Sequence, residues 1–237
     1  MKKENDYAGG NAATSNEVLN KLRASVLGAN DGIVSTSSVL MGVAGATNST
    51  DAIFTAGLAA LVAGALSMAV GEYVSVSSQS DAEKAFIKRE KKLLKEDPEG
   101  EFDGLVQAYV SRGINPHTAE QVAKELTKGD ALKAHLMAHF GFNEDEVVNP
   151  THAAVASLIS FTVGGLIPFL TILLSPEPVR IWTTGVAVLM ALFLTGYMSA
   201  TVGGASRRRA IARVVVGGVV AMVVTYYVGM LFGAKVS

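Results

Sequence analysis

The chain contains no cysteine and has few charged and few aromatic residues for its length. Without cysteine, a disulfide framework, a thiolate metal site and a cysteine nucleophile are all excluded. Only 17% of its 237 residues are charged and 49% are hydrophobic, whereas a soluble domain carries about 25% charged residues. This composition excludes a disordered or collagen-like chain, and the net charge of −1 provides no basic surface for nucleic acid. The composition favours an integral membrane protein.

The charges that are present are concentrated in one segment. Residues 77–150 hold 24 of the 41 charged residues. The rest of the chain contains apolar runs close to the ~20 residues that a helix needs to cross a bilayer. The expected membrane spans are residues 24–46, 53–76, 152–174, 179–203 and 210–233. The sequence therefore predicts an all-α membrane protein with five transmembrane helices and a polar insertion between the second and the third.

This pattern divides the chain into four parts. Residues 1–23 form a polar N-terminal tail without a signal-peptide pattern. Residues 24–76 contain the first two spans, residues 77–150 the insertion, and residues 151–237 the last three spans. We interpret the insertion as a small helical cytosolic domain, because it is too long and too regularly patterned for a linker; the family resemblance described below implies that it is a cytosolic helical metal-binding domain.

The distribution of Lys and Arg predicts the orientation in the membrane. Eighteen of the 20 basic residues fall in the tail, in the insertion and in the connection between spans four and five. Because basic residues favour the cytosolic side, the N-terminus and the insertion are expected in the cytosol and the C-terminus outside. The connection between spans four and five either only fixes this orientation or also binds anionic lipid headgroups. Its basic residues are Arg207, Arg208, Arg209 and Arg213.

Apolar residues at three-to-four spacing predict helices throughout the insertion. The first, over residues 80–95, continues the second span as one long helix until Asp97-Pro98 breaks it. Further helices are expected over residues 99–112, 118–126 and 130–140.

Two acidic residues, Asp31 and Glu72, lie within the expected spans. An ionisable residue in a bilayer is costly and usually marks an ion path or a paired structural site. Asp31 and Met68 reach similar depth if the first two spans pack antiparallel, and Met68 and Glu72 share one helix face. Carboxylate oxygens with a thioether sulfur suit Fe²⁺ better than Mg²⁺ or Ca²⁺. The alternatives are that Asp31 caps a broken helix, that Met68 only packs and that Glu72 is solvated near the membrane surface.

The insertion offers a second group of metal ligands. His135 and His139 are four residues apart, a spacing that suits two imidazole ligands on one helix face. No glutamate stands between them as in a zinc-protease motif. Glutamates crowd the first two helices of the insertion, and Glu83 and Glu90 are two turns apart on one face. The alternative for these carboxylates is an ordinary solvated helix face.

Two long motifs resemble the vacuolar iron transporter family. Residues 23–35 (RASVLGANDGIVS) are similar to the family's first span, and residues 64–79 (GALSMAVGEYVSVSSQ) to its second. Residues 96–101 and 149–150 follow the family's insertion and its entry into the third span. The resemblance covers about residues 20–235.

The resemblance implies a five-span homodimer that exports Fe²⁺, and often Mn²⁺ or related ions, from the cytosol in exchange for protons. It implies no enzymatic activity, no prosthetic group and no nucleic-acid partner. Asp31 and Met68 match family residues that line the translocation path, and Glu90 and Glu101 match two glutamates that hold metal.

The chain also departs from the family pattern. Leu93 and Gly104 stand where plant members carry glutamates, which weakens the case for a multi-ion cluster. His135 and His139 stand where those members carry methionine and glutamate, which shifts the expected preference towards Zn²⁺, Co²⁺ or Ni²⁺. Glu72 matches bacterial-type members, so a bacterial inner membrane is the expected location.

These observations support a first hypothesis, a divalent-metal/proton antiporter. Metal would gather at the insertion and then pass along the first two spans, and protons would compete for the same carboxylates. The second hypothesis is a membrane-anchored metal sensor or storage protein without transport. A membrane metallo-hydrolase is a third, but no motif unites a water-activating metal with a general base. The residues assigned to the metal route are Glu90, Glu101, His135, His139, Glu72, Met68 and Asp31, with Glu83 and Glu99 as secondary candidates.

Overall fold

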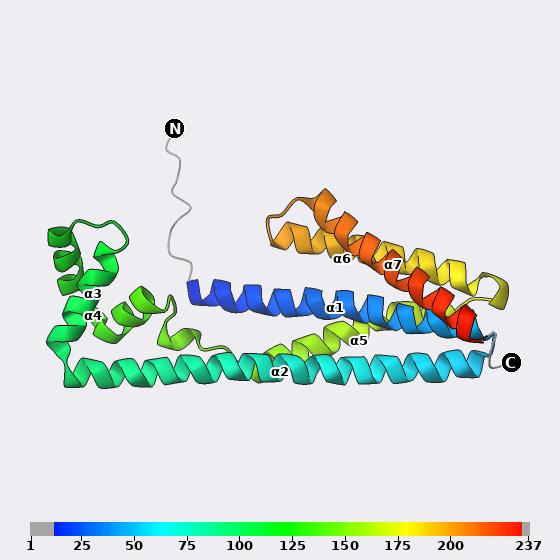
Figure 1. Ribbon diagram of the computed structural model, residues 1–237, viewed down its shortest axis with the longest axis horizontal. Helices are drawn as coiled ribbons and strands as arrows, with labels where there is room; N and C mark the ends of the chain where they lie inside the picture. The colour runs from blue at the N-terminus through cyan, green and yellow to red at the C-terminus, as the bar shows by residue number, and fades with distance from the viewer. Residues whose placement is uncertain (1–11, 234–237) are drawn as a thin grey trace. The chain divides into compact units, whose positions relative to one another are not determined.

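The computed structural model describes the backbone of residues 12–233 and the side chains of residues 24–233 except Glu146 and Val202. The basic residues expected in the N-terminal tail, and Lys235, therefore lie outside the described side chains. The described chain is helical and contains no strand within residues 12–233, which confirms the all-α prediction (Figure 1). Its elements are α1 (Ala12–Ala46), α2 (Thr50–Glu96), α3 (Pro98–Val110), α4 (Pro116–His139), η1 (Glu144–Glu146), α5 (Pro150–Leu174), η2 (Glu177–Val179), α6 (Arg180–Val202) and α7 (Arg207–Gly233).

Four of the described helical segments are long and apolar enough to cross a membrane. They are α2, α5, residues 177–201 around α6, and α7. α1 is not among them, because Asn30, Asp31 and the hydroxyl residues at 35–38 lower its hydropathy. The structure thus supports four of the five expected spans by length and composition, and the crossing by α1 stays a prediction.

α1 extends further towards the N-terminus than the expected membrane span. This helix begins at Ala12, whereas the span was expected to begin at residue 24. The span was placed where charged residues give way to apolar ones, and charge does not end a helix. Residues 12–27 contain no glycine or proline to interrupt it.

The prediction of one long helix through the second span and the first part of the insertion is confirmed. α2 runs for 47 residues from Thr50 to Glu96. It ends where Asp97 caps α3, accepting a hydrogen bond from the Gly100 amide at 2.9 Å. The chain divides into two compact units within this helix, between Val74 and Ser75. We call residues 19–74 with 150–237 the apolar unit, and residues 75–149 the polar unit.

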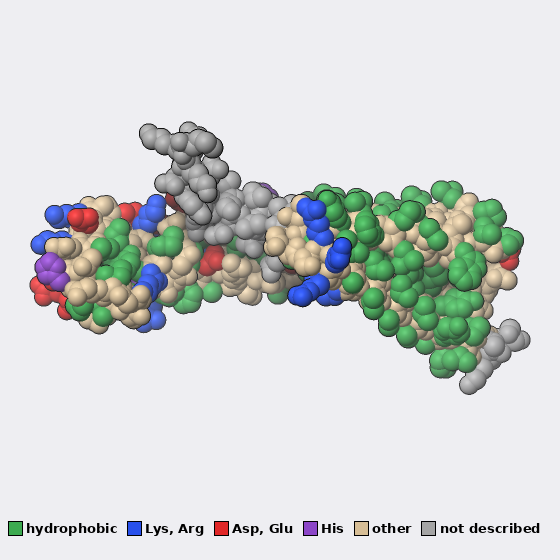
Figure 2. Space-filling view, turned by 90° about the horizontal axis from the view of Figure 1, so that it is seen from above, with side chains coloured by type: hydrophobic (Ala, Val, Ile, Leu, Met, Phe, Trp, Pro, Cys, Tyr) green, Lys and Arg blue, Asp and Glu red, His purple; other side chains and the backbone are tan. Residues whose placement is uncertain are grey.

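Two clusters of buried side chains hold the apolar unit together. Ile33 and Met41 of α1 pack against Val188 and Leu192 of α6 and against Met222 of α7. The second cluster joins α1, α2 and α5 through Leu40, Ile53, Phe169 and Ile172. Large hydrophobic side chains remain exposed along α2, α6 and α7, and Figure 2 shows many hydrophobic side chains on the face of the apolar unit that it views. Such a surface fits an acyl-chain environment.

The polar unit has its own small core between α3 and α4. Leu105 packs against Ala123, Ala134 and Ala138. The helices expected over residues 118–126 and 130–140 form one element, α4, which is kinked at Asp130. Asp130 has non-helical backbone angles, and its carboxylate accepts a hydrogen bond from the Lys133 amide at 3.0 Å. It therefore caps the second half of α4, at the start of the helix that was expected over residues 130–140.

Candidate metal centres

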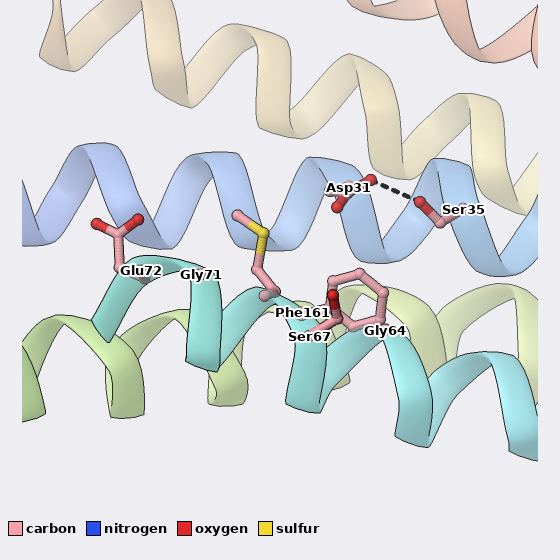
Figure 3. Close-up of a pocket in the computed structure, with 8 residues that line it drawn as sticks. Asp31, Ser35, Gly64, Ser67, Gly71, Glu72 and Phe161 are labelled. Atoms are coloured by element: carbon pink, nitrogen blue, oxygen red, sulfur yellow. Dashed lines mark hydrogen bonds between the residues drawn. The ribbon is translucent and has the colours of Figure 1, made fainter. Parts of the chain in front are cut away.

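A cavity of about 290 Å³ lies in the apolar unit among α1, α2 and α5. Side chains and glycines from these three helices surround it (Figure 3). The lining residues are Asp31, Ser35, Gly64, Ser67, Met68, Gly71, Glu72 and Phe161. The structure thus brings together Asp31, Met68 and Glu72, the three residues that the sequence analysis assigned to a path.

Helical periodicity explains most of this lining. On α2, Gly64, Met68 and Glu72 recur at intervals of four, and residues at this spacing share a helix face. On α1, Asp31 and Ser35 are likewise four residues apart. Phe161 of α5 is almost fully buried and closes against Gly64, where an added Cβ would overlap its ring.

The polar lining of the cavity is acidic. Asp31 is partly buried, and Ser35 Oγ donates a hydrogen bond to its Oδ1 at 2.5 Å. Glu72 is also partly buried, and in Figure 3 its carboxylate is directed from α2 towards α1. Met68 packs against the cluster of Leu61, Ala65 and Phe161. No Lys or Arg occurs among the described lining residues, so the cavity offers carboxylate and thioether ligands to a cation without a competing positive charge.

A second group of ligands lies in the polar unit, where α2, α3 and α4 meet. His135 Nδ1 is 2.8 Å from Glu90 Oε1 and 3.3 Å from Glu101 Oε2. One ligand atom from each of Glu90, His135 and His139 lies within 4.8 Å of the others. The structure therefore assembles four predicted ligands from three helices into one cluster, which we call the Glu–His cluster (Glu90, Glu101, His135 and His139).

Burial makes this cluster unusual. The side chains of His135 and Glu90 are only 1% and 5% exposed. Although His135 Nδ1 and Glu90 Oε1 are close, they are not aligned for a hydrogen bond, and neither atom has another hydrogen-bond partner among the residues that the structure describes. Leaving buried polar atoms unsatisfied is costly. A cation shared by the two atoms would satisfy both, so this arrangement fits a metal site.

The electrostatics of the cluster are those of crowded carboxylates. Burial is the largest cause that raises the pKa of Glu101 above its ordinary value. The negative charge of Glu90 and a hydrogen bond with Glu90 raise this pKa further, while His135 and His139 partly oppose the shift. Glu101 therefore holds a proton more readily than an ordinary glutamate, and a metal ion that binds there must displace it.

The secondary candidates lie outside this cluster. Glu83 accepts a hydrogen bond from Gln79 at 2.8 Å, and Glu99 is exposed in the first turn of α3. Leu93 and Gly104 contribute no ligand atoms near Glu90 and Glu101. The cluster contains two imidazoles and two carboxylates, which are ligand types found in four-coordinate metal sites.

The sequence analysis missed three residues that shape these sites. Ser35 contacts Asp31, which is four residues earlier on the same helix face. This spacing within one motif could have predicted the contact. Phe161 comes from a distant helix, and nothing in the sequence connected it with Gly64. Arg112 donates a hydrogen bond from Nη2 to the carbonyl of Ala138, next to His139, and so fastens the end of α4 to α3.

The apolar helices and the two groups of cation ligands define the class: an α-helical membrane protein with sites suited to divalent metals. A model of the VIT family matches residues 22–230. The chain is 42% identical to "Vacuolar iron transporter" of Acanthamoeba castellanii, covering 89% of this chain and 78% of that protein. It is 39% identical to "Vacuolar iron transporter homolog 1" of Oryza sativa subsp. japonica, covering 90% and 74%. It is 36% identical to "Vacuolar iron transporter homolog 3" of Arabidopsis thaliana, covering 90% and 84%. The chain therefore belongs to the VIT family, which confirms the resemblance seen in its motifs.

Proposed function

We propose that this protein is a divalent-metal/proton antiporter that exports Fe²⁺ from the cytosol. The family points to metal-ion transport, and relatives are named as iron transporters. The observation that carries the proposal is the cavity in the apolar unit, where Asp31, Met68 and Glu72 meet without a basic residue among the described lining residues. An anchor has no use for an acidic cavity among apolar helices, because each buried carboxylate is costly there.

In this proposal α1 also crosses the membrane, so that it and the four candidate spans make five transmembrane helices. Its low hydropathy does not oppose this, because its polar residues face the protein interior. Thr36 and Ser37 are fully buried, and Asp31 faces the cavity. Polar residues of transmembrane helices normally face the bundle interior in this way. With five spans, the N-terminus, the polar unit and the arginine connection lie in the cytosol, and the C-terminus lies outside.

Metal is first held by the Glu–His cluster and then by the cavity. Protons provide the coupling, because a carboxylate must lose its proton before it binds a metal ion. Metal arriving at Asp31 and Glu72 releases protons, and protons entering from the opposite side displace the metal. Exchange at the same oxygen atoms couples the two fluxes without a separate proton site.

The two donor sets favour different ions. Oxygen and sulfur donors in the cavity favour Fe²⁺, and Mn²⁺ is a further substrate. The two imidazoles of the Glu–His cluster favour Zn²⁺, Co²⁺ or Ni²⁺. We place the protein as a homodimer in a membrane, with a bacterial inner membrane as the proposed location. It acts as a transporter and not as an enzyme.

The second candidate is a membrane-anchored metal sensor or storage protein. The observation that favours it is the group of potential metal ligands in the Glu–His cluster within the polar unit. This candidate predicts metal binding without metal flux.

Proteoliposomes that contain the full chain test the proposal. Fe²⁺ uptake and internal pH are followed together under an imposed pH gradient, for wild type and for Asp31→Asn. Asp51→Asn is the matched control, because Asp51 is exposed in the first turn of α2 and does not line the cavity. We expect uptake with opposite proton movement in wild type and in the control, and its loss in Asp31→Asn. Full activity of Asp31→Asn would refute the role of the cavity, uptake without proton movement would indicate a uniporter, and binding without uptake would favour the sensor.

A further inference from the structure

Four arginines in the first two turns of α7 have no part in the metal route. Arg207, Arg208, Arg209 and Arg213 are all exposed. Within the described part of the chain, no carboxylate lies within ion-pair distance of any of them. Arg207 lies over the ring of Tyr197, 5.0 Å from its centroid. The start of α7 therefore carries four positive charges that the described part of the chain does not neutralise.

Two of these arginines lie at one end of an exposed apolar face of α7. Residues three and four apart share a helix face. Arg209 and Arg213 lie on the same face as Val216 and Val220, which are 60% and 55% exposed. The face continues through exposed residues to Tyr227. The opposite face, with Gly218 and Met222, is buried in the bundle.

The dimensions of this face match one leaflet of a bilayer. From Arg213 to Val223 the helix rises about 15 Å at ~1.5 Å per residue. Half of the ~30 Å hydrocarbon core is also about 15 Å. Gly217 lies within the face, and an added Cβ would meet no atom within 4 Å there. An acyl chain can therefore lie along α7 while its headgroup reaches Arg209 and Arg213.

We propose that an anionic phospholipid binds along this face of α7, with its phosphate held by Arg209 and Arg213. Guanidinium groups bind phosphate oxygens in bidentate geometry, and two of them one turn apart can grip one phosphate. Figure 2 shows Lys and Arg side chains gathered at one end of the hydrophobic surface, where a phosphate would meet them. We call this proposed binding site the lipid site (Arg209, Arg213, Val216, Gly217, Val220 and Val223).

A second copy of the chain fits this face less well. Two copies inserted in the same orientation would place Arg209 and Arg213 at the same height. A symmetric contact through this face would bring like charges together, whereas a phosphate neutralises them.

The alternative is that the arginines act only through their number, by fixing orientation in the membrane. A matched pair of double variants separates the two roles. Arg209→Gln/Arg213→Gln removes the two arginines of the lipid site. Arg207→Gln/Arg208→Gln removes the same number of charges from the same end of α7 but leaves the lipid site intact. Both leave most of the basic residues on that side of the membrane in place.

The experiment is native mass spectrometry of the full chain in detergent, titrated with phosphatidylglycerol or phosphatidylcholine. We expect wild type to retain phosphatidylglycerol in preference to phosphatidylcholine. Arg209→Gln/Arg213→Gln should weaken this binding by roughly fivefold per arginine, about 30-fold in total, and Arg207→Gln/Arg208→Gln should change it little. Equal loss in the two double variants, or equal binding of the two lipids, would overturn the proposal. Efficient disulfide cross-linking of Val220→Cys between copies in native membranes would also overturn it, because a second copy would then cover the face.

Discussion

Ser35, one turn further along α1 than Asp31, donates a hydrogen bond from its hydroxyl to Asp31 Oδ1 at 2.5 Å. No other hydrogen-bond partner of Asp31 occurs among the described residues. The bond fixes the direction of the carboxylate that lines the cavity. Ser35 is therefore a positioning residue for Asp31 in the proposed transport cycle.

Replacing Ser35 with alanine should weaken Fe²⁺ uptake without abolishing it. A hydrogen bond to a charged group contributes about 1.5 kcal/mol, which corresponds to roughly a tenfold higher apparent KM. The control is Ser38→Ala, because the Ser38 hydroxyl has no hydrogen-bond partner in the structure. Initial uptake rates against Fe²⁺ concentration measure the effect. Equal KM values for Ser35→Ala and Ser38→Ala would show that the bond is irrelevant to transport.

Replacing Met68 with leucine should change metal preference more than overall activity. The volume stays similar, but the thioether sulfur is lost from the cavity. Sulfur contributes more to binding of Fe²⁺ and Co²⁺ than of Mn²⁺, so the ratio of Fe²⁺ to Mn²⁺ uptake should fall by roughly fivefold. Met190→Leu, at an exposed position on α6, should leave the ratio unchanged. An unchanged ratio in Met68→Leu would assign Met68 to packing alone.

Metal binding by the Glu–His cluster should weaken as the pH falls. Because the pKa of Glu101 is raised, its proton begins to compete with metal at a higher pH than that of an ordinary glutamate. In Glu101→Gln this competition is removed. Its metal affinity should therefore be lower at neutral pH but should fall less steeply towards acid pH. Calorimetric titration of the full chain with Zn²⁺ at several pH values measures both slopes, and parallel slopes would contradict the prediction.

Replacing Gly64 with alanine should destabilise the apolar unit. The added methyl group would overlap the Phe161 ring, which is almost fully buried. Overpacking of this kind costs typically 1–3 kcal/mol, so about 2 kcal/mol is expected here. At Gly185 on α6 an added Cβ meets no atom within 4 Å, so Gly185→Ala should be neutral or slightly stabilising. Thermal unfolding of the two variants in detergent compares them, and equal melting temperatures would mean that the Phe161 ring moves freely.

The sequence predicted the features that depend on periodicity along one helix. These include the length of α2 and the common face of Met68 and Glu72. The helical start of α1 at Ala12 was not predicted, because only the membrane span was placed from hydropathy, and hydropathy describes the solvent around a helix and not the helix itself. The place of Phe161 beside Gly64 depends on how α5 packs against α2, and no spacing within one segment encodes that contact. The proximity of Glu90, Glu101 and His135 was expected from the resemblance. That Glu90 and His135 form no hydrogen bond with each other is visible only in the three-dimensional structure.

Leu93 and Gly104 carry no ligand atoms, so the proposed metal site in the Glu–His cluster has donors for a single ion. A site with this capacity is saturated by the first ion that arrives, so its occupancy follows the free metal concentration only around its own dissociation constant. One ion per chain is too little for storage, so this feature counts against the storage form of the second candidate and not against a sensor. In the proposed transport route, such a site passes ions on one at a time, because the next ion binds only after the preceding one has left.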